Sequence, residues 1–98
     1  MTTVANVRTW HGDYRDAVLI DRTTKWGNPF KAGQRAGAPV TRGTVIALFQ
    51  SWWEAPAQAA LRAQALVELR DKVLLCHCAP LACHGDIIAA FVNRETTS

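Results

Sequence analysis

One segment of this chain, residues 76–86, limits the possible folds more than any other. This Cys–His segment contains all three cysteines of the 98-residue sequence and two of its three histidines. The apolar residues 73–75 precede it, and a second apolar stretch, residues 87–92, follows it. This order predicts a buried strand, a tight loop and a helix, with reactive side chains gathered where the strand ends. Ligands of open α/β sheets bind at that edge.

The N-terminal part of the chain supplies two further strand candidates. Residues 3–8 place alternate side chains on two faces, and residues 17–21 form an apolar run typical of a strand covered on both sides. Residues 73–78 complete the predicted sheet. We therefore expect an α/β fold, a small Rossmann-like sandwich whose short sheet is at least partly parallel. Residues 1–93 would form one domain and residues 94–98 a frayed tail.

About three helices complete this prediction. Thr44 is the expected N-cap of a helix with an apolar face, and Pro56 suits the first turn of a second helix. The third helix covers residues 84–92, with Asn93 as a left-handed C-cap. Residues 22–40 show no periodicity and are rich in Gly, Pro, Lys and Arg. We expect a long loop there, of the kind that often carries function.

Composition argues against several classes of protein. The sequence shows no apolar run that could span a membrane and no secretion signal. Three clustered cysteines do not suit a disulfide framework, so we expect a cytoplasmic protein with reduced thiols. Residues 1–42 carry a net charge of +4 and residues 43–98 a net charge of −1. The basic half favours an anionic partner, such as a nucleotide, free phosphate or nucleic acid, although a solvated arginine-rich surface is an equal alternative.

The Cys–His segment suggests thiol chemistry. Cys83 and His84 fall at the start of the predicted last helix, where the helix dipole lowers the pKa of a thiol. We expect Cys83 to be a catalytic thiolate, with His84 or Cys78 as its proton partner. Asp86 would accept hydrogen bonds from the first helical turn or orient His84. The alternative is structural, with Cys76 and Cys78 as small core residues and His84 as a helix cap.

The same segment permits a zinc or iron site, whose candidate ligands are Cys76, Cys78, Cys83 and His84. Structural zinc usually binds two separated ligand pairs. Here the spacing Cys-x-Cys-x4-Cys-His places all four within nine residues. An iron–sulfur cluster would use the three thiolates. Because the chain offers no second ligand pair, metal binding is the weaker prediction.

A second motif, residues 25–30, lies in the predicted basic loop. Its Gly, Asn and Pro favour a tight turn. Trp26 and Phe30 offer surfaces on which a nucleotide base stacks, and neighbouring cations suit phosphate. The alternative is that both aromatic residues anchor the loop to the core. The expected ligand-binding residues are Asn6, Arg8, Arg22, Lys25, Trp26 and Asn28.

Four segments together resemble a known family. Residues 6–8, 20–22 and 26–30, with the Cys–His segment, are similar to the domain of unknown function 4326, a family of small proteins from bacteria and their phages. The resemblance covers nearly the whole chain. It implies a small Rossmann-like α/β domain with polar residues pooled at one sheet end, and it supplies no activity. The family often carries tryptophan where this chain has His77, so His77 is assigned no function.

The combined prediction is a small domain that binds a nucleotide or a nucleic-acid component and uses Cys and His side chains to act on it. The sequence contains no Walker loop, serine triad or paired-carboxylate motif, which argues against kinase, P-loop and glycosidase functions. One alternative is a non-catalytic module that binds nucleic acid or protein. The other is a structural zinc or iron–sulfur domain.

Overall fold

The computed structural model describes residues 1–30, 33–35, 38–79 and 81–96. Among these residues, three short strands form one sheet in the order β1-β5-β2: β1 (Thr3–Asn6), β2 (Ala17–Leu19) and β5 (Val73–Cys76). β5 pairs in parallel with both of its neighbours. The predicted α/β fold with a parallel sheet is confirmed.

β5 lies at the centre of the sheet because its side chains are apolar on both faces. Leu74, Leu75 and Cys76 are all buried, as expected for a continuous apolar run between parallel neighbours. Asn6 of β1 pairs with Cys76, and Leu19 of β2 pairs with Leu75. The carboxyl ends of the three strands therefore meet at one edge of the sheet.

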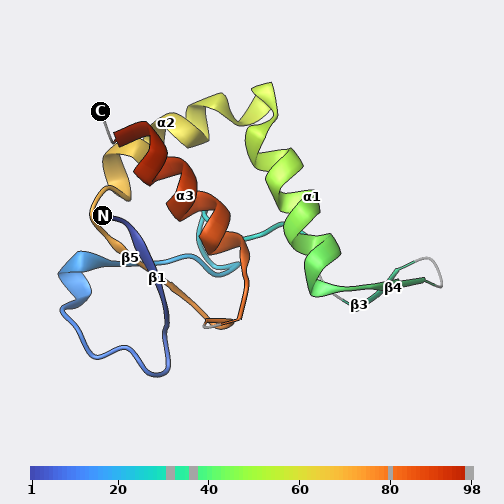
Figure 1. Cartoon of the computed structure of the whole chain (residues 1–98), viewed down its shortest axis with the longest axis horizontal. Helices are drawn as coiled ribbons and strands as arrows, with labels where there is room; N and C mark the ends of the chain where they lie inside the picture. Colours follow the sequence, from blue (N-terminus) through green and yellow to red (C-terminus); the bar gives the residue numbers. More distant parts are fainter. Residues whose placement is uncertain (31–32, 36–37, 80, 97–98) are drawn as a thin grey trace.

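The described part of the chain contains three α-helices: α1 (Arg42–Glu54), α2 (Ala59–Glu68) and α3 (His84–Thr96). Short 3-10 helices at Tyr14–Asp16 and Pro56–Gln58 precede β2 and α2. α3 contacts β1 and β5 as well as the other two helices, and Figure 1 shows it beside α1. α3 therefore links the sheet to the rest of the helical layer.

The start of α1 differs from the prediction. Thr41, not Thr44, is the N-cap: its backbone is extended, and its hydroxyl accepts a hydrogen bond from the Thr44 N–H at 3.2 Å. Thr44 lies inside the first turn instead of before it. The helix thus begins at Arg42, which places a cation in its first turn.

The end of α3 also differs from the prediction. The helix continues to Thr96, so Asn93 is not a left-handed C-cap. The Asn93 amide accepts a hydrogen bond from the Thr2 N–H at 2.8 Å and donates one to the Thr2 carbonyl at 2.9 Å. These two bonds of the Asn93 side chain tie α3 to the start of the chain. Residues 94–96 are therefore helical, and residues 97–98 lie outside the described part.

The predicted long loop contains a β-hairpin. β3 (Gly33–Arg35) and β4 (Ala38–Val40) pair antiparallel, and Figure 1 shows them extending away from the sheet and the helices. Strands of three residues are too short for their periodicity to be detected in the sequence. No helix among the described residues is long and apolar enough to cross a membrane.

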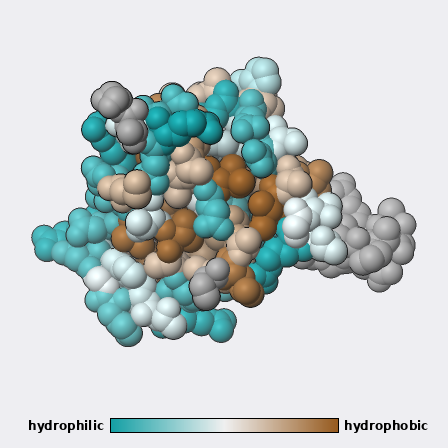
Figure 2. Space-filling view, in the orientation of Figure 1, coloured by the Kyte–Doolittle hydropathy of each residue, from teal (hydrophilic) through white to brown (hydrophobic). Residues whose placement is uncertain are grey.

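The core lies between the sheet and the helices. Ile20, Leu74 and Ile88 are fully buried there. From α1, Phe49 and Trp53 are also buried, and their rings stack with centroids 5.8 Å apart. Figure 2 shows that apolar residues also reach the surface in the middle of the face seen in Figure 1. The buried side chains of this core fix the position of the sheet edge at which β2 and β5 end.

Candidate functional site

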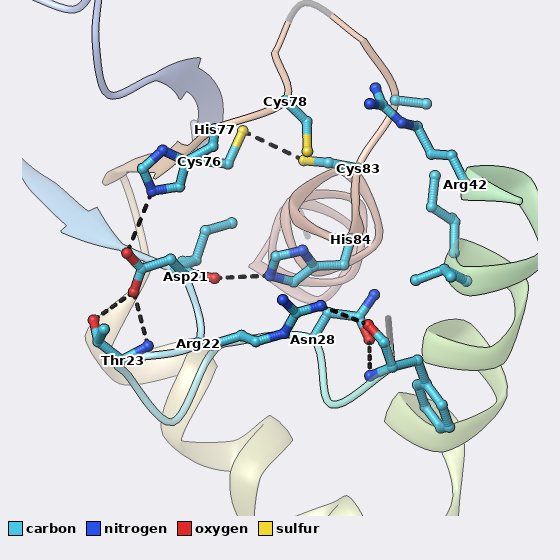
Figure 3. Close-up of a pocket in the computed structure, with 15 residues that line it drawn as sticks. Asp21, Arg22, Thr23, Asn28, Arg42, Cys76, His77, Cys78, Cys83 and His84 are labelled. Carbon is cyan, nitrogen blue, oxygen red and sulfur yellow. Dashed lines mark hydrogen bonds and ion pairs between the residues drawn. The ribbon is translucent and has the colours of Figure 1, made fainter. Parts of the chain in front are cut away.

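The described residues surround a cavity of about 400 Å³ at the carboxyl ends of β2 and β5, a volume typical of small-molecule sites. This strand-end cavity lies between the basic segment (residues 21–30), the Cys–His segment and the first turns of α1 (Figure 3). Its apolar lining residues are Ile20, Phe30, Val45, Ile46 and Ala82. Its polar and sulfur-bearing lining residues are Asp21, Arg22, Thr23, Asn28, Arg42, Cys76, His77, Cys78, Cys83 and His84.

His84 joins the two segments that flank the cavity. Its Nε2 lies 2.9 Å from the Ile20 carbonyl oxygen and 3.1 Å from the Trp26 carbonyl oxygen. Because a carbonyl oxygen only accepts hydrogen bonds, Nε2 carries the proton and donates to both. The ring also meets Phe49 edge-on, with centroids 5.1 Å apart. The side chain is thus held in one orientation and one tautomer.

Burial keeps His84 neutral. It lowers the pKa of the imidazole below the usual 6.5, and the positive charge of Arg22 acts in the same direction, whereas the two backbone carbonyls oppose the shift. With the proton on Nε2, the neutral ring has a lone pair on Nδ1, and no described residue donates to it. His84 can therefore accept a hydrogen bond or a proton from a ligand.

Asp86 secures the start of α3. Its Oδ2 accepts a hydrogen bond from the Cys83 N–H at 3.0 Å, and the Asp86 N–H donates to the Cys83 carbonyl at 3.1 Å. The first bond is the half of a capping box that the N3 carboxylate supplies, and the second is a backbone turn. The sequence predicted that Asp86 would accept from the first helical turn, and its donor here is the residue directly before that turn. Asp86 does not line the cavity; it positions the residues that do.

The Cys83 thiol is buried and protonated, contrary to the expected acidic thiolate. Only 4% of Cys83 is exposed, and its Sγ lies 3.5 Å from Cys76 Sγ. Burial, the hydrogen bond to Cys76 and the negative charge of an ionised Cys76 raise the pKa of Cys83 to about 12. The N–H of Gly85 opposes this rise without overcoming it. The helix start therefore does not create a nucleophile at Cys83. Cys78 is half-buried and lines the cavity.

The sulfur and imidazole groups do not assemble a metal site. Within the described residues, no three His, Cys, Asp or Glu side chains are grouped so that they could hold a metal ion. The Nε2 of His84 already donates to backbone carbonyls, and the Cys83 thiol donates a hydrogen bond to the Cys76 sulfur. Of the predicted zinc or iron ligands, three have other hydrogen-bond partners, namely Cys76, Cys83 and His84. The fourth, Cys78, is not grouped with them as a metal ligand.

The basic segment presents Arg22 and Asn28 to the cavity. Asn28 Oδ1 accepts a hydrogen bond from the Phe30 N–H at 2.8 Å, which closes an Asx turn. Arg22 Nη2 donates to the Phe30 carbonyl at 3.1 Å, and its guanidinium makes no other hydrogen bond within the described residues. Gly27 lets the two ends of this segment approach each other, because a Cβ there would lie 2.4 Å from the Asp21 carbonyl oxygen.

Trp26 and Lys25 do not line the cavity, although both were expected to bind ligand. Trp26 is only 4% exposed and belongs to the core cluster, so it has no open face on which a base could stack. The Lys25 Nζ lies over the Trp26 ring and bonds to Glu68 at 2.8 Å and to Gln64 at 2.7 Å. Both residues fasten the basic segment to the protein.

Asn6 and Arg8 lie outside the cavity as well. The Asn6 Nδ2 donates to the Ala79 carbonyl at 2.9 Å, and its Oδ1 accepts a hydrogen bond from the Arg8 N–H at 2.9 Å. Asn6 therefore holds the end of β1 to the Cys–His segment. The Arg8 side chain is exposed. Of the predicted site residues, the structure brings six to the cavity: Arg22, Asn28, Cys76, Cys78, Cys83 and His84.

Two charged residues of the cavity, Arg42 and Asp21, were not among the predicted site residues. Arg42 occupies the first turn of α1, which contains no acidic residue. A cation is disfavoured at a helix N-terminus, and this unusual position could have drawn attention to it. Asp21 accepts hydrogen bonds from the Thr23 N–H at 2.9 Å and from the Thr23 hydroxyl, and its other oxygen lies 3.4 Å from His77 Nε2. The bonds from Thr23 are the main cause of the lowered pKa of Asp21. The Asp-x-Thr sequence directly after β2 favours a turn of this kind, and it could have drawn attention to Asp21.

Comparison with known proteins extends these observations. Residues 5–94 match the model of a family described as domain of unknown function (DUF4326). An "Uncharacterized 12.4 kDa protein in nrdA-td intergenic region" of Enterobacteria phage T4 is 41% identical over 78 residues, which cover 79% of this chain and 68% of the phage protein. No solved structure matches the chain. The chain, whose Cys–His segment and basic segment meet at one cavity, therefore belongs to the DUF4326 family.

Proposed function

We propose that this domain binds a nucleotide in the strand-end cavity. The observation that carries the proposal is the lining itself: the cationic side chains of Arg22 and Arg42 outnumber the carboxylate of Asp21 around a hollow of about 400 Å³ at the carboxyl ends of parallel strands. A pocket of this size, with apolar walls and a few convergent polar groups, is typical of small-molecule sites. Two cations select for an anionic ligand.

Arg22 is the proposed phosphate ligand. Its guanidinium uses one N–H group on the Phe30 carbonyl, and a guanidinium has five N–H donors in all. Arg22 and Asn28 also line a second hollow of about 290 Å³, into which a charged end of the ligand could extend. Figure 3 shows the guanidinium of Arg42 on the opposite side of His84 from that of Arg22. Arg42 would therefore contact a different part of the ligand.

The base of the nucleotide would pack on the apolar wall. Phe30 is half-buried and lines the cavity together with Val45 and Ile46 of α1. An aromatic ring next to aliphatic side chains suits a flat heterocycle, since base–aromatic stacking contributes about 1–3 kcal/mol per base. Phe30 takes the stacking function that the sequence shared between Trp26 and Phe30.

His84 would act as the acceptor in the site. Its neutral ring keeps Nδ1 unprotonated, so it can accept a hydrogen bond from a base amino group or a sugar hydroxyl. If the bound nucleotide undergoes a reaction, His84 is the proposed proton acceptor. Cys83 is not the nucleophile of this proposal, because its thiol keeps its proton. Cys78 is the thiol that we propose for such a reaction, because it lines the cavity and is the most exposed of the three cysteines.

Isothermal titration with the four common nucleoside 5′-monophosphates tests the proposal. We expect saturable binding of at least one of them, and Arg22→Gln should weaken it by about tenfold or more, as expected when one charge-assisted hydrogen bond is lost. Arg8→Gln is the matched control, because it removes the same charge from an exposed side chain outside the cavity. Its affinity should stay within about twofold of that of the unchanged protein.

Two results would contradict this function. One is the absence of saturable binding for all four nucleotides. The other is tight, salt-dependent binding of a single-stranded oligonucleotide that Arg8→Gln and Arg22→Gln weaken equally. That pattern would indicate a surface for nucleic acid, in which exposed cations act together, and not a cavity for a single nucleotide.

A further inference from the structure

The strongest unexplained feature of the cavity is a pair of sulfur atoms in contact. Cys76 stands at the end of β5 and Cys83 directly before α3, and their Sγ atoms are 3.5 Å apart. Both residues are buried, both line the strand-end cavity, and both are free thiols. The nucleotide proposal uses neither of them. Figure 3 shows this contact beside His84.

The hydrogen bonds distinguish the two sulfurs. The Cys83 thiol donates to Cys76 Sγ, and the Ala79 N–H also donates to Cys76 Sγ, at 3.4 Å. Cys76 is thus the acceptor of two hydrogen bonds, and Cys83 is the group that keeps its proton. Burial is the main reason why the pKa of Cys83 rises to about 12, and the hydrogen bond to Cys76 adds to the rise. Because two donors face Cys76 Sγ, Cys76 is the sulfur of the pair that is placed to act as the nucleophile.

A small oxidant can reach this pair through the cavity that both residues line. A disulfide bond has an S–S length of about 2.0 Å, so the two sulfurs need to approach each other by about 1.5 Å from their present separation of 3.5 Å. Cys83 lies in a connecting segment, outside the strand and the helix on either side of it. Rotation of the two side chains and a small shift of this segment supply the movement.

We propose that Cys76 and Cys83 are a site of reversible oxidation, at which a hydroperoxide converts the two thiols into an intramolecular disulfide. The Cys76 thiolate attacks the O–O bond, so that an S–O bond forms, the O–O bond breaks and the leaving oxygen takes up a proton as an alcohol or water. The Cys83 sulfur then displaces hydroxide from the sulfenic acid of Cys76, and this hydroxide leaves with the Cys83 proton as water. Each round of this reaction oxidises two thiols to one disulfide and reduces one hydroperoxide.

The test treats the reduced full-length chain with hydrogen peroxide, unfolds it, labels free thiols with N-ethylmaleimide and measures its mass. We use the variant Cys78→Ser, in which Cys76 and Cys83 are the two remaining cysteines. The changed residue lies outside their sulfur contact. In this variant we expect a mass lower by two hydrogens and no label, and then two labels after treatment with dithiothreitol. The same variant oxidised in urea should form the disulfide more slowly, because the folded structure no longer holds the sulfurs together.

Two chains with a single cysteine identify the attacking sulfur. The chain that keeps only Cys76 (Cys78→Ser with Cys83→Ser) should trap dimedone, a reagent for sulfenic acid, faster than the chain that keeps only Cys83 (Cys76→Ser with Cys78→Ser). The proposal fails if Cys78→Ser retains two free thiols after peroxide, or if the disulfide joins two chains. It also fails if Cys83 alone reacts as fast as Cys76 alone. None of these readouts depends on nucleotide binding.

Discussion

The Cys–His segment and the basic segment have similar features in sequence, since each collects polar or reactive side chains after a strand. The structure uses them in opposite ways. The Cys–His segment buries its thiols, so that Cys76 and Cys83 are only 2% and 4% exposed and contact each other. The basic segment buries its large ring, Trp26, and leaves the charged Arg22 at the cavity. The fold thus decides which of these side chains are packed against each other and which remain accessible.

The two segments are also joined in a way that neither sequence pattern revealed. His84 belongs to the Cys–His segment, and it donates one proton to the Ile20 and Trp26 carbonyls before and within the basic segment. The contact runs from a side chain to the backbone. It orients the histidine and joins the two segments that line the cavity.

The largest effect is expected at the buried ring of the basic segment. Trp26→Ala should lower the free energy of unfolding by about 3–5 kcal/mol, because it removes a large aromatic side chain from the core. Urea denaturation followed by circular dichroism measures this loss. Trp10→Ala is the control: Trp10 is half-buried outside the core cluster, and we expect a cost of about 1 kcal/mol. Equal losses in the two variants would mean that Trp26 is not the anchor of the basic segment.

A smaller effect on stability is expected from His84, whose hydrogen bonds join the two segments. The unfolded chain protonates His84 near its usual pKa of 6.5, whereas the folded protein lowers that pKa. As the pH falls below 6.5, the unfolded state binds a proton that the folded state resists, so the free energy of unfolding decreases; above 6.5 this contribution does not change.

The non-titrating variant His84→Gln isolates this effect. Denaturation at several pH values between 7 and 5 should show a shallower loss of stability for His84→Gln than for the unchanged protein. The other histidines and the carboxylates remain in both proteins and cancel in the difference. Parallel curves would show that His84 is as easily protonated in the folded protein as in the unfolded one.

The smallest effect is expected at the lysine of the basic segment. Lys25→Gln removes the ion pair with Glu68, in which both side chains are 46% exposed. Such a pair contributes less than about 1 kcal/mol to stability, and calorimetry should detect only this small change. The affinity for any nucleotide that the cavity binds should be unchanged, because Lys25 lies outside it. A tenfold loss of affinity in Lys25→Gln would contradict this and show that Lys25 contributes to nucleotide binding.

Local sequence signals predicted the fold better than the site. The apolar residues 73–75 and 87–92 indicated a strand and a helix on either side of the Cys–His segment, and the structure has both. The cap of α1 was misplaced because Thr41 and Thr44 both carry hydroxyl groups that suit an N-cap, and only the backbone conformation distinguishes them. The hairpin within the predicted loop was missed because its strands are too short to show periodicity.

The sequence by itself determined the α/β class, the order of the main elements and the resemblance to a family, because strands and helices follow patterns of neighbouring residues. Only the tertiary structure decided that Arg22 and Arg42 line one cavity, that Trp26 belongs to the core, and that Cys83 keeps its proton. The physical reason is that the burial, charge and hydrogen bonding of a side chain depend on groups far away in the chain. The Cys83 thiol keeps its proton because of its burial and its hydrogen bond to Cys76 across the loop, and the neutrality of His84 depends on its burial against the basic segment.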